Sequence, residues 1–407
     1  MRRIALWLSW LLLFIVPWEY LYEKGTLGTL VRTAGIGLAG VWALSVVAAL
    51  RVRQPHPLHL LMIAFALWCA ASILWSLDPE ASRLQVETYA QLVLLALIVW
   101  DLYEEPAHLN TGLQAYVLGC WVCIAELLEV FLAGEMQRRF SVGAFNENTL
   151  GFTLSLGLPV AWYLATVARA HEGIGGRLAP ALRISNLAFI PVALFGIALT
   201  ASRSSMACGL LAVGYMVVSL GGVRRGARIL LFGGAAALAM YGVSLIPKTS
   251  ADRLESTTVE LSDGDWNGRL PTWKEAFRMI SERPLAGVGV KAFQVGAVET
   301  RAAPHNLVLS ITAELGVVGL ALFSSILLGC ALVAFRQPRP LALFWLVMLV
   351  SWTLNALLHN FEDKKFTWLM FGMIAVSGGL YETRSAAPVR ARPAAAPPRP
   401  VAEGRAR

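Results

Sequence analysis

The stretch "APHNLVLSITAELGVVGL" (residues 303–320) places a proline and a histidine before an apolar run that continues to residue 335. A helix needs about 20 mostly apolar residues to cross a hydrocarbon core of roughly 30 Å. The run from 306 to 335 is long enough, and its one carboxylate is Glu314. The stretch therefore predicts a membrane helix with a histidine, His305, at its mouth.

Apolar runs of the same kind recur along the whole chain. Of its 407 residues 57% are hydrophobic and 15% charged, and the mean hydropathy is +0.61. The runs are continuous rather than alternating, which favours helices over the strands of a membrane barrel. We predict an all-α polytopic membrane protein with twelve transmembrane helices, at about residues 4–22, 30–50, 58–77, 88–103, 111–131, 150–167, 184–200, 205–220, 227–247, 306–335, 341–358 and 367–381.

The distribution of basic residues predicts the orientation. An even number of spans puts both termini on one side of the membrane. With the N-terminus inside, the inner segments hold 18 of the 34 Lys and Arg residues, and the short outer segments hold 8. The other eight lie in one long outer loop, which the positive-inside rule largely ignores. We therefore predict that both termini are cytoplasmic.

The spans divide the chain into four parts. Residues 1–247 hold the first nine helices, 248–304 form a long periplasmic loop, 305–382 hold the last three helices, and 383–407 form a disordered, basic cytoplasmic tail. In the loop, Trp273, Ala276, Phe277 and Ile280 recur at helical spacing between charges, which predicts an amphipathic helix on the membrane surface. The net charge of +8 comes mostly from the inner segments and the tail, so it does not indicate a nucleic-acid partner.

Five cysteines all fall inside apolar runs, two of them in "CWVC" at 120–123. Thiols one turn apart within a membrane helix are expected to pack against neighbouring side chains. The sequence therefore predicts no disulfide framework.

Three polar side chains on the predicted outer side indicate a chemical site. Arg203 lies in the short turn "TASRSS" (200–205), Arg269 just ahead of the amphipathic helix, and His305 at the mouth of its span. A charge at membrane depth is costly, so such a residue is a functional candidate, although a snorkelled surface side chain is the alternative. Guanidinium groups suit phosphate oxygens, and an imidazole accepts a proton near neutral pH. Together they predict a site that binds a lipid-linked phosphate and deprotonates a hydroxyl.

Two acidic features are given smaller roles. Asp263 and Asp265 form an Asp-x-Asp pattern that holds a metal in some glycosyltransferases, but no histidine or further acid stands beside them, and no metal site is predicted. Glu314 is nine residues from His305, on the opposite side of a helical wheel, and is expected to bond a neighbouring helix. Gly316 shares the face of His305, where a small residue allows close helix approach.

Four blocks resemble the O-antigen ligase and polymerase superfamily. "HNLVLSITAELGVVGL" (305–320) resembles its signature of His-Asn followed by Glu-x-Gly-x-x-Gly. "FNENTLGFTLSLGLPVAW" (145–162), "LTASRSSMACGLL" (199–211) and "GRLPTWKEAFRMISERPLAGVGVKAF" (268–293) resemble its other blocks, in the family's order. The resemblance extends from about residue 140 to 335.

The resemblance implies a glycosyltransferase of the bacterial inner membrane that uses a glycan on undecaprenyl pyrophosphate and needs no metal or other cofactor. His305 would be the general base for the acceptor hydroxyl. Arg203 and Arg269 would bind the pyrophosphate, and direct attack would invert the anomeric carbon.

The family's later functional positions are matched by "HNFEDKK" (359–365), which makes His359, Asp363 and Lys364 reserve candidates. Ligase members of the family transfer the glycan to the lipid A–core oligosaccharide. Polymerase members transfer it to another repeat unit, and related members to a protein serine or threonine.

We interpret the chain as an O-antigen ligase with a periplasmic active site, because one long loop late in a chain of modest length is typical of ligases. A transporter of lipid-linked glycans is the alternative from another class. Transporters gather polar groups near the bilayer midplane, whereas the candidate residues here gather at one surface.

Overall fold

The computed structural model describes residues 1–21, 23, 24, 28–134, 139–168, 178–220, 226, 269–300 and 302–386. The predicted span 227–247, residues 248–268 of the predicted loop, with Asp263 and Asp265, and the tail beyond residue 386 lie outside the described residues.

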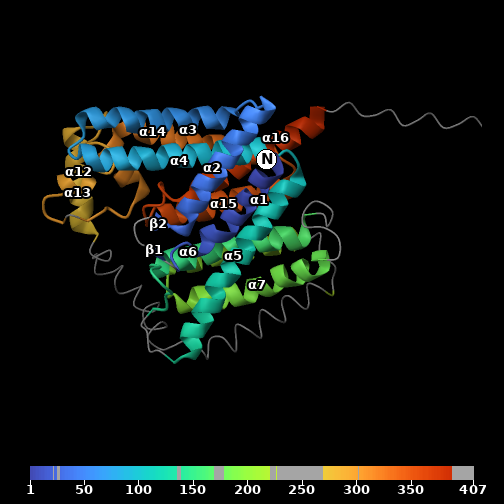
Figure 1. The fold of residues 1–407 in the computed structure, drawn as a ribbon. Helices are drawn as coiled ribbons and strands as arrows, with labels where there is room; N and C mark the ends of the chain where they lie inside the picture. The colour runs from blue at the N-terminus through green and yellow to red at the C-terminus, as the bar shows by residue number, and fades with distance from the viewer. Residues whose placement is uncertain are drawn as a thin grey trace, which may run out of the picture.

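The described residues form a helical bundle, with one short β pairing (Figure 1). The first half holds α1 (Arg2–Ile15), η1 (Val16–Trp18), β1 (Glu23–Lys24), β2 (Gly28–Thr29), α2 (Leu30–Ala49), α3 (Pro57–Ser72), η2 (Ile73–Trp75), α4 (Pro79–Leu102) and α5 (Pro106–Leu132). The second half holds α6 (Glu147–Thr166), α7 (Ala179–Leu199), α8 (Arg203–Ser219), α12 (Leu270–Glu282), α13 (Phe293–Gly296), α14 (Leu307–Phe335), α15 (Arg339–Ala356) and α16 (Lys365–Ala386). The antiparallel pairing of β1 with β2 joins α1 to α2 and was not predicted.

Eleven of the twelve predicted spans fall on these helices. Among the described residues, eight helices are long and apolar enough to cross a membrane, namely α2, α3 with η2, α4, α5, α6, α7, α14 and α15. The prediction of a polytopic membrane protein is confirmed at this level. That α1, α8 and α16 also cross the membrane stays a prediction.

Local sequence explains where the helices begin. Proline stands in the first turn of α3, α4, α5, α7, α12 and α15, where its missing N–H costs no hydrogen bond. Side-chain caps begin other helices: Asn146 accepts from the N–H of Asn148 at 2.9 Å, and Asn306 accepts from that of Leu309 at 3.1 Å. The asparagine of the His-Asn pair therefore fixes the start of α14 and the position of His305 before it.

The core of the bundle is aromatic, and its fully buried tryptophans are hydrogen-bonded. Four tryptophans are fully buried, and each indole N–H donates to a hydroxyl or carbonyl oxygen, as buried indoles require. These bonds run from Trp162 to Ser219, Trp345 to Ser377, Trp352 to Thr367 and Trp368 to Glu362. The five cysteines are buried and free, which confirms the expectation that they pack.

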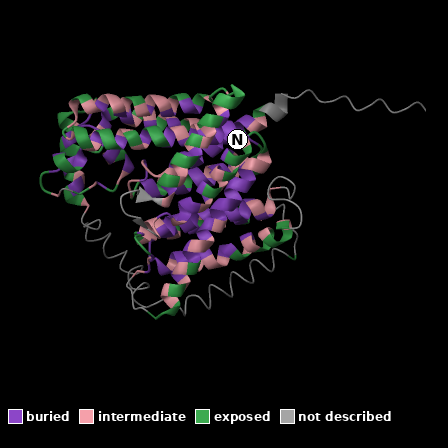
Figure 2. Ribbon diagram, in the orientation of Figure 1, coloured by how far each residue is buried: buried purple, intermediate pink, exposed green. Residues whose placement is uncertain are grey.

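Apolar side chains also cover the outside of the bundle. Figure 2 shows buried residues along the centre and exposed or intermediate residues on the outer faces of the helices. Many exposed residues are large and apolar, including Ile36, Val47, Leu67, Leu210 and Leu328. An apolar outer surface of this extent is what contact with lipid requires.

Ionic contacts mark one end of the bundle. Arg2, at the start of α1, lies 3.1 Å from Asp101 Oδ2 and 3.3 Å from Glu104 Oε1. The backbone N–H of Arg53 donates to Asp101 Oδ1 at 2.7 Å, and its guanidinium lies 3.5 Å from the ring centroid of Trp100. These contacts tie the ends of α1, α2 and α4 together at the end predicted to be cytoplasmic.

The helices α12 and α13 cover the other end, at the left of Figure 1. The predicted amphipathic helix exists as α12, and it buries Ala276 and Met279 in a small apolar cluster with Phe293 and Ala313. Phe277, which was assigned to the same apolar face, is 60% exposed. One part of the apolar face of α12 thus packs against the protein, and another part is exposed on the surface of the molecule.

Candidate active site

His305 lies at the outer mouth of α14 in a constrained backbone conformation. Its φ of 46° is in the left-handed region, which histidine tolerates better than most residues. Asn306 caps the helix immediately after it, and the carbonyl of Pro304 accepts the indole N–H of Trp273 at 3.0 Å. Helix α12 therefore holds the residue that precedes His305, while the His305 side chain stays exposed.

Arg269 lies beside His305 at the beginning of α12. Its carbonyl accepts the N–H of Trp273 at 2.9 Å, and its side chain is partly buried. Burial lowers the pKa of Arg269, but a guanidinium stays charged at neutral pH. Partial desolvation and the charge of Arg269 lower the pKa of His305. The pair predicted from sequence is thus brought together.

His359 completes this group and is more enclosed than His305. Its Nδ1 lies 3.2 Å from the carbonyl oxygen of Asn355, and its ring stacks on Phe361, with centroids 5.3 Å apart. A carbonyl only accepts, so Nδ1 carries the proton and Nε2 holds a lone pair in the neutral ring. In the described part of the chain, the buried Nε2 has no hydrogen-bond partner.

Charged neighbours contribute to the pKa of His359. Burial and, to a smaller extent, the charges of Arg269, His305 and Arg139 together lower it to about 4, against the opposing effect of the Asn355 carbonyl. The other three side chains therefore lie within electrostatic range of His359, and we call Arg139, Arg269, His305 and His359 the basic cluster.

Arg139 is the member that the sequence did not reveal. Its guanidinium lies 3.2 Å from Glu147 Oε2, donates to Asn148 Oδ1 at 2.6 Å, and donates to the carbonyl of Thr200 at 3.2 Å. Glu147 and Asn148 belong to "FNEN", and Thr200 opens "TASRSS", so Arg139 joins two of the blocks recognised from sequence. Arg139 lies only a few residues before "FNEN" in the sequence, and this proximity was the signal from which its role could have been predicted.

Arg203 lies at the same end of the molecule. It is the first residue of α8, three residues after Thr200. Helix α8 packs against α15, where Asn355 Nδ2 donates to Cys208 Sγ at 2.7 Å. Arg203 is therefore connected to the basic cluster through Arg139 and Thr200 on one side and through α15, which leads to His359, on the other.

The reserve candidates Asp363 and Lys364 belong to an adjoining ionic group rather than to the basic cluster. Asp363 lies 3.5 Å from Lys291 Nζ and 3.7 Å from Lys364 Nζ. Burial lowers the pKa of Lys364, but Asp363, Tyr20 and Glu19 together raise it above its ordinary value. Lys364 is thus held as a charged structural cation.

Glu314 and Gly316 form a break in α14 that the helical wheel did not allow for. Gly316 has φ 68° and ψ −173°, and a side chain there would overlap the backbone of Leu285 and Ala286. The carbonyl of Glu314 accepts the N–H of Gly289 at 2.8 Å, and its carboxylate accepts the N–H of Lys291 at 2.8 Å.

The prediction that Glu314 bonds a neighbouring helix is confirmed only in part: its carboxylate bonds the backbone of Lys291, in the loop that follows α12, and that of Phe293, the first residue of the short helix α13. Gly316 does allow a close approach, but to the backbone of that loop. The wheel comparison with His305 also fails, since His305 precedes the helix.

No group of three or more His, Cys, Asp or Glu side chains that could hold a metal ion is found in the described residues. Asp263 and Asp265 lie outside that part of the chain.

Comparisons with known proteins agree with the sequence resemblance. The model of a family described as O-antigen ligase matches residues 188–324, which include Arg203, Arg269 and His305. The chain is 27% identical over 348 residues to an O-antigen ligase of Pseudomonas aeruginosa, covering 83% of this chain and 76% of that protein. It is 24% identical over 342 residues to the exopolysaccharide production protein ExoQ of Rhizobium meliloti, covering 75% and 74%.

Proposed function

Because the chain belongs to the O-antigen ligase superfamily, we propose that it transfers a glycan from undecaprenyl pyrophosphate to a hydroxyl of the lipid A–core oligosaccharide. The observation that carries the proposal is the meeting of Arg269, His305 and His359 at one end of a bundle with an apolar outer surface. By the predicted orientation, this end faces the periplasm of a bacterial inner membrane.

The basic groups suit the anionic part of such a donor. In this proposal Arg203 and Arg269 bind the pyrophosphate oxygens and stabilise the negative charge that grows as the glycosidic C–O bond breaks. Arg139, which lies within electrostatic range of His359, adds positive charge at this end of the bundle, part of which Glu147 offsets. The arginines would thus supply the charge stabilisation for which other glycosyltransferases use a divalent metal.

His305 has the properties of a general base. It is exposed, and its lowered pKa keeps it mostly neutral at pH 7, so it can take the proton of the acceptor hydroxyl. The acceptor oxygen then attacks the anomeric carbon opposite the pyrophosphate, which leaves with the bonding electron pair, and the anomeric configuration inverts. Loss of the base should reduce turnover about 10²–10⁴-fold.

A polymerase that adds the glycan to another repeat unit is the second candidate. The similarity to a protein named for exopolysaccharide production supports this second candidate. A protein O-oligosaccharyltransferase would use the same site with a serine or threonine as acceptor. A transporter fits less well, because the candidate residues lie at the mouths of α8 and α14 rather than at their middles.

The test is a reconstituted reaction. Full-length protein in liposomes is given an undecaprenyl-pyrophosphate glycan, lipid A–core acceptor and a chelator, and products are separated on a gel. We expect glycan on the core, a loss of roughly 100-fold in Arg203→Ala and Arg269→Ala, and no loss in Arg336→Ala at the opposite end. A lengthened donor would identify a polymerase. No transfer of either kind would contradict the proposal.

A further inference from the structure

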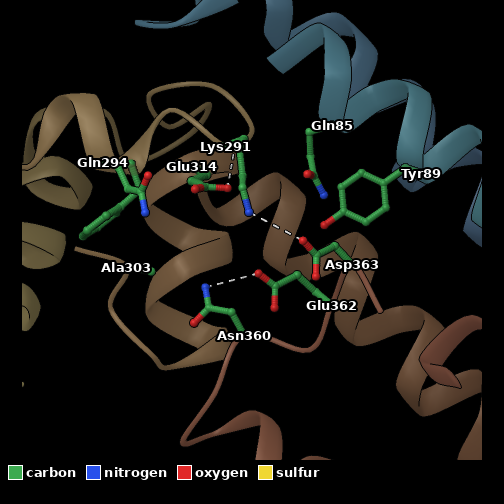
Figure 3. A pocket seen from close by; sticks show the side chains of 10 residues that line it. Gln85, Tyr89, Lys291, Gln294, Ala303, Glu314, Asn360, Glu362 and Asp363 are labelled. Atoms are coloured by element: carbon green, nitrogen blue, oxygen red, sulfur yellow. Dashed lines mark hydrogen bonds and ion pairs between the residues drawn. The ribbon is translucent and has the colours of Figure 1, made fainter. Parts of the chain in front are cut away.

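A cavity of about 30 Å³ lies between α4, α14 and the loop that joins α15 to α16 (Figure 3). Its wall combines Gln85 and Tyr89 of α4, Glu314 of α14, and Asn360 and Glu362 of the loop between α15 and α16. These residues come from segments far apart in sequence, and the transfer chemistry proposed above uses none of them. The cavity is therefore a polar feature that still lacks a role.

Some of its polar groups are satisfied within the protein. The Glu314 carboxylate accepts the backbone N–H of Lys291 at 2.8 Å. Asp363 lies between the ammonium groups of Lys291 and Lys364, at 3.5 and 3.7 Å. These contacts fix the wall of the cavity and need no ligand.

Two other residues of the wall each keep one buried oxygen that accepts no hydrogen bond from the described residues. Glu362 is only 8% exposed, and its Oε1 receives a hydrogen bond from Asn360 Nδ2 at 3.4 Å, whereas its buried Oε2 has no partner among the described residues. Asn360 Nδ2 also donates to Ser310 Oγ at 2.9 Å, which fixes the amide orientation. Its Oδ1 is then buried without a donor in the same part of the chain.

Buried oxygens of this kind call for a ligand that donates hydrogen bonds. Three carboxyl groups in the wall disfavour an anion. A hydroxyl fits best, because it can both donate a hydrogen bond and accept one from the protonated form of Glu362, which burial and Asp363 favour by raising the pKa of that carboxyl group. The volume suits one water-sized group such as a hydroxyl or hydroxymethyl, but not a sugar ring.

The position of the cavity relates it to the basic cluster. Ala303 lies on its wall and comes two residues before His305, while Asn360 follows His359 directly. A sugar joined to a pyrophosphate at the basic cluster would thus have its ring next to the cavity and one hydroxyl within reach of it.

We propose that this cavity is a subsite for one hydroxyl group of the sugar attached to the pyrophosphate, with the side chains of Glu362 and Asn360 as its hydrogen-bond partners. The proposal rests on the proposed function, because it takes the basic cluster as the pyrophosphate site. It gives the loop between α15 and α16 a role in recognising the glycan rather than the lipid.

The experiment compares two ligands on full-length protein in nanodiscs. One is undecaprenyl pyrophosphate, and the other is the same lipid carrying one N-acetylglucosamine. We expect wild type to bind the sugar-bearing lipid roughly tenfold more tightly, as two hydrogen bonds would give. Ala303→Leu fills the cavity without removing a polar group, and Glu362→Met removes both carboxyl oxygens. Each should abolish the tenfold gain and leave binding of the bare lipid unchanged.

The matched control is Ala302→Leu, on the exposed neighbour of Ala303, which should keep the gain. Thermal unfolding of all variants checks that each is folded. Equal binding of the two lipids by wild type, or a retained gain in folded Ala303→Leu, would overturn the subsite and leave a cavity for water only. Failure of wild type to bind the bare lipid would instead overturn the proposed function, and the subsite with it.

Discussion

At the scale of single residues, His359 should make stability depend on pH. Its pKa in the folded protein is about 4, below the ordinary value near 6.5, so the unfolded chain binds a proton more readily. The free energy of unfolding should therefore be unaffected by His359 well above pH 6.5 and should fall as the pH drops from 6.5 towards 4, by about 3 kcal/mol.

Thermal unfolding in detergent between pH 4.5 and 7.5 measures this effect. His359→Gln should lose less stability than wild type on acidification, so the difference between the two curves isolates the histidine from other titrating groups. Curves that run parallel over this range would show that His359 is not held neutral by its surroundings.

At the scale of elements, the break in α14 joins the two segments that carry Arg269 and His305. The loop after α12 supplies hydrogen bonds to the interrupted helix: Val288 N–H donates to Ala313 and Gly289 N–H to Glu314, and Val317 N–H donates to Pro284. The indole N–H of Trp68 donates to the carbonyl of Leu315 at 2.9 Å. The backbone groups freed by the break thus have partners, as a low-dielectric setting requires.

Gly316→Ala should disturb this junction. The backbone conformation at Gly316 is one that essentially only glycine adopts, and a Cβ would overlap the backbone of Leu285. We expect a loss of about 2 kcal/mol in stability together with reduced transfer, measured by thermal unfolding and by the reconstituted reaction. The control is Gly214→Ala in α8, where the added methyl group meets nothing within 4 Å. Equal stability of the two variants would contradict this account of the break.

The same elements show what the sequence could predict. The apolar runs predicted the positions of most helices, because whether a run is apolar enough to lie in lipid depends on that run alone. Helix α14, for example, was predicted at 306–335 and lies at Leu307–Phe335. Helix α4 begins nine residues before its predicted start, since its polar first turns continue the helix beyond the apolar run. The break at Gly316 depends on a partner loop, which hydropathy does not register.

The candidate site divides in the same way. Arg269 and His305 were predicted together because the topology put both on one surface, and the structure has them as neighbours. Arg139 and the cavity were missed because they depend on contacts between distant segments, such as Arg139 with Thr200. No single stretch of sequence contains that information.

At the scale of the whole molecule, the two ends of the bundle differ in chemistry. Arg2, Asp101 and Glu104 form ion pairs at one end, and the basic cluster and the cavity lie at the other. The predicted orientation puts the second end in the periplasm. The tail beyond residue 386 would then be cytoplasmic.

Cysteine labelling in spheroplasts tests this orientation. The five native thiols are buried, so they should give little background with a membrane-impermeant maleimide. Ala302→Cys should be labelled from outside, and Arg336→Cys should be labelled only after lysis, since both positions are exposed but lie at opposite ends. The reverse pattern would place the basic cluster in the cytoplasm.

The central claim is that His305 acts as the base at a site whose arginines hold the pyrophosphate. The measurement that tests it most directly is the single-turnover rate of glycan transfer by wild type, His305→Ala and His305→Gln, with binding of the lipid donor measured on the same preparations. The account predicts that all three bind the donor and that both variants transfer the glycan at least about 100-fold more slowly. Transfer by His305→Ala at the wild-type rate would contradict it.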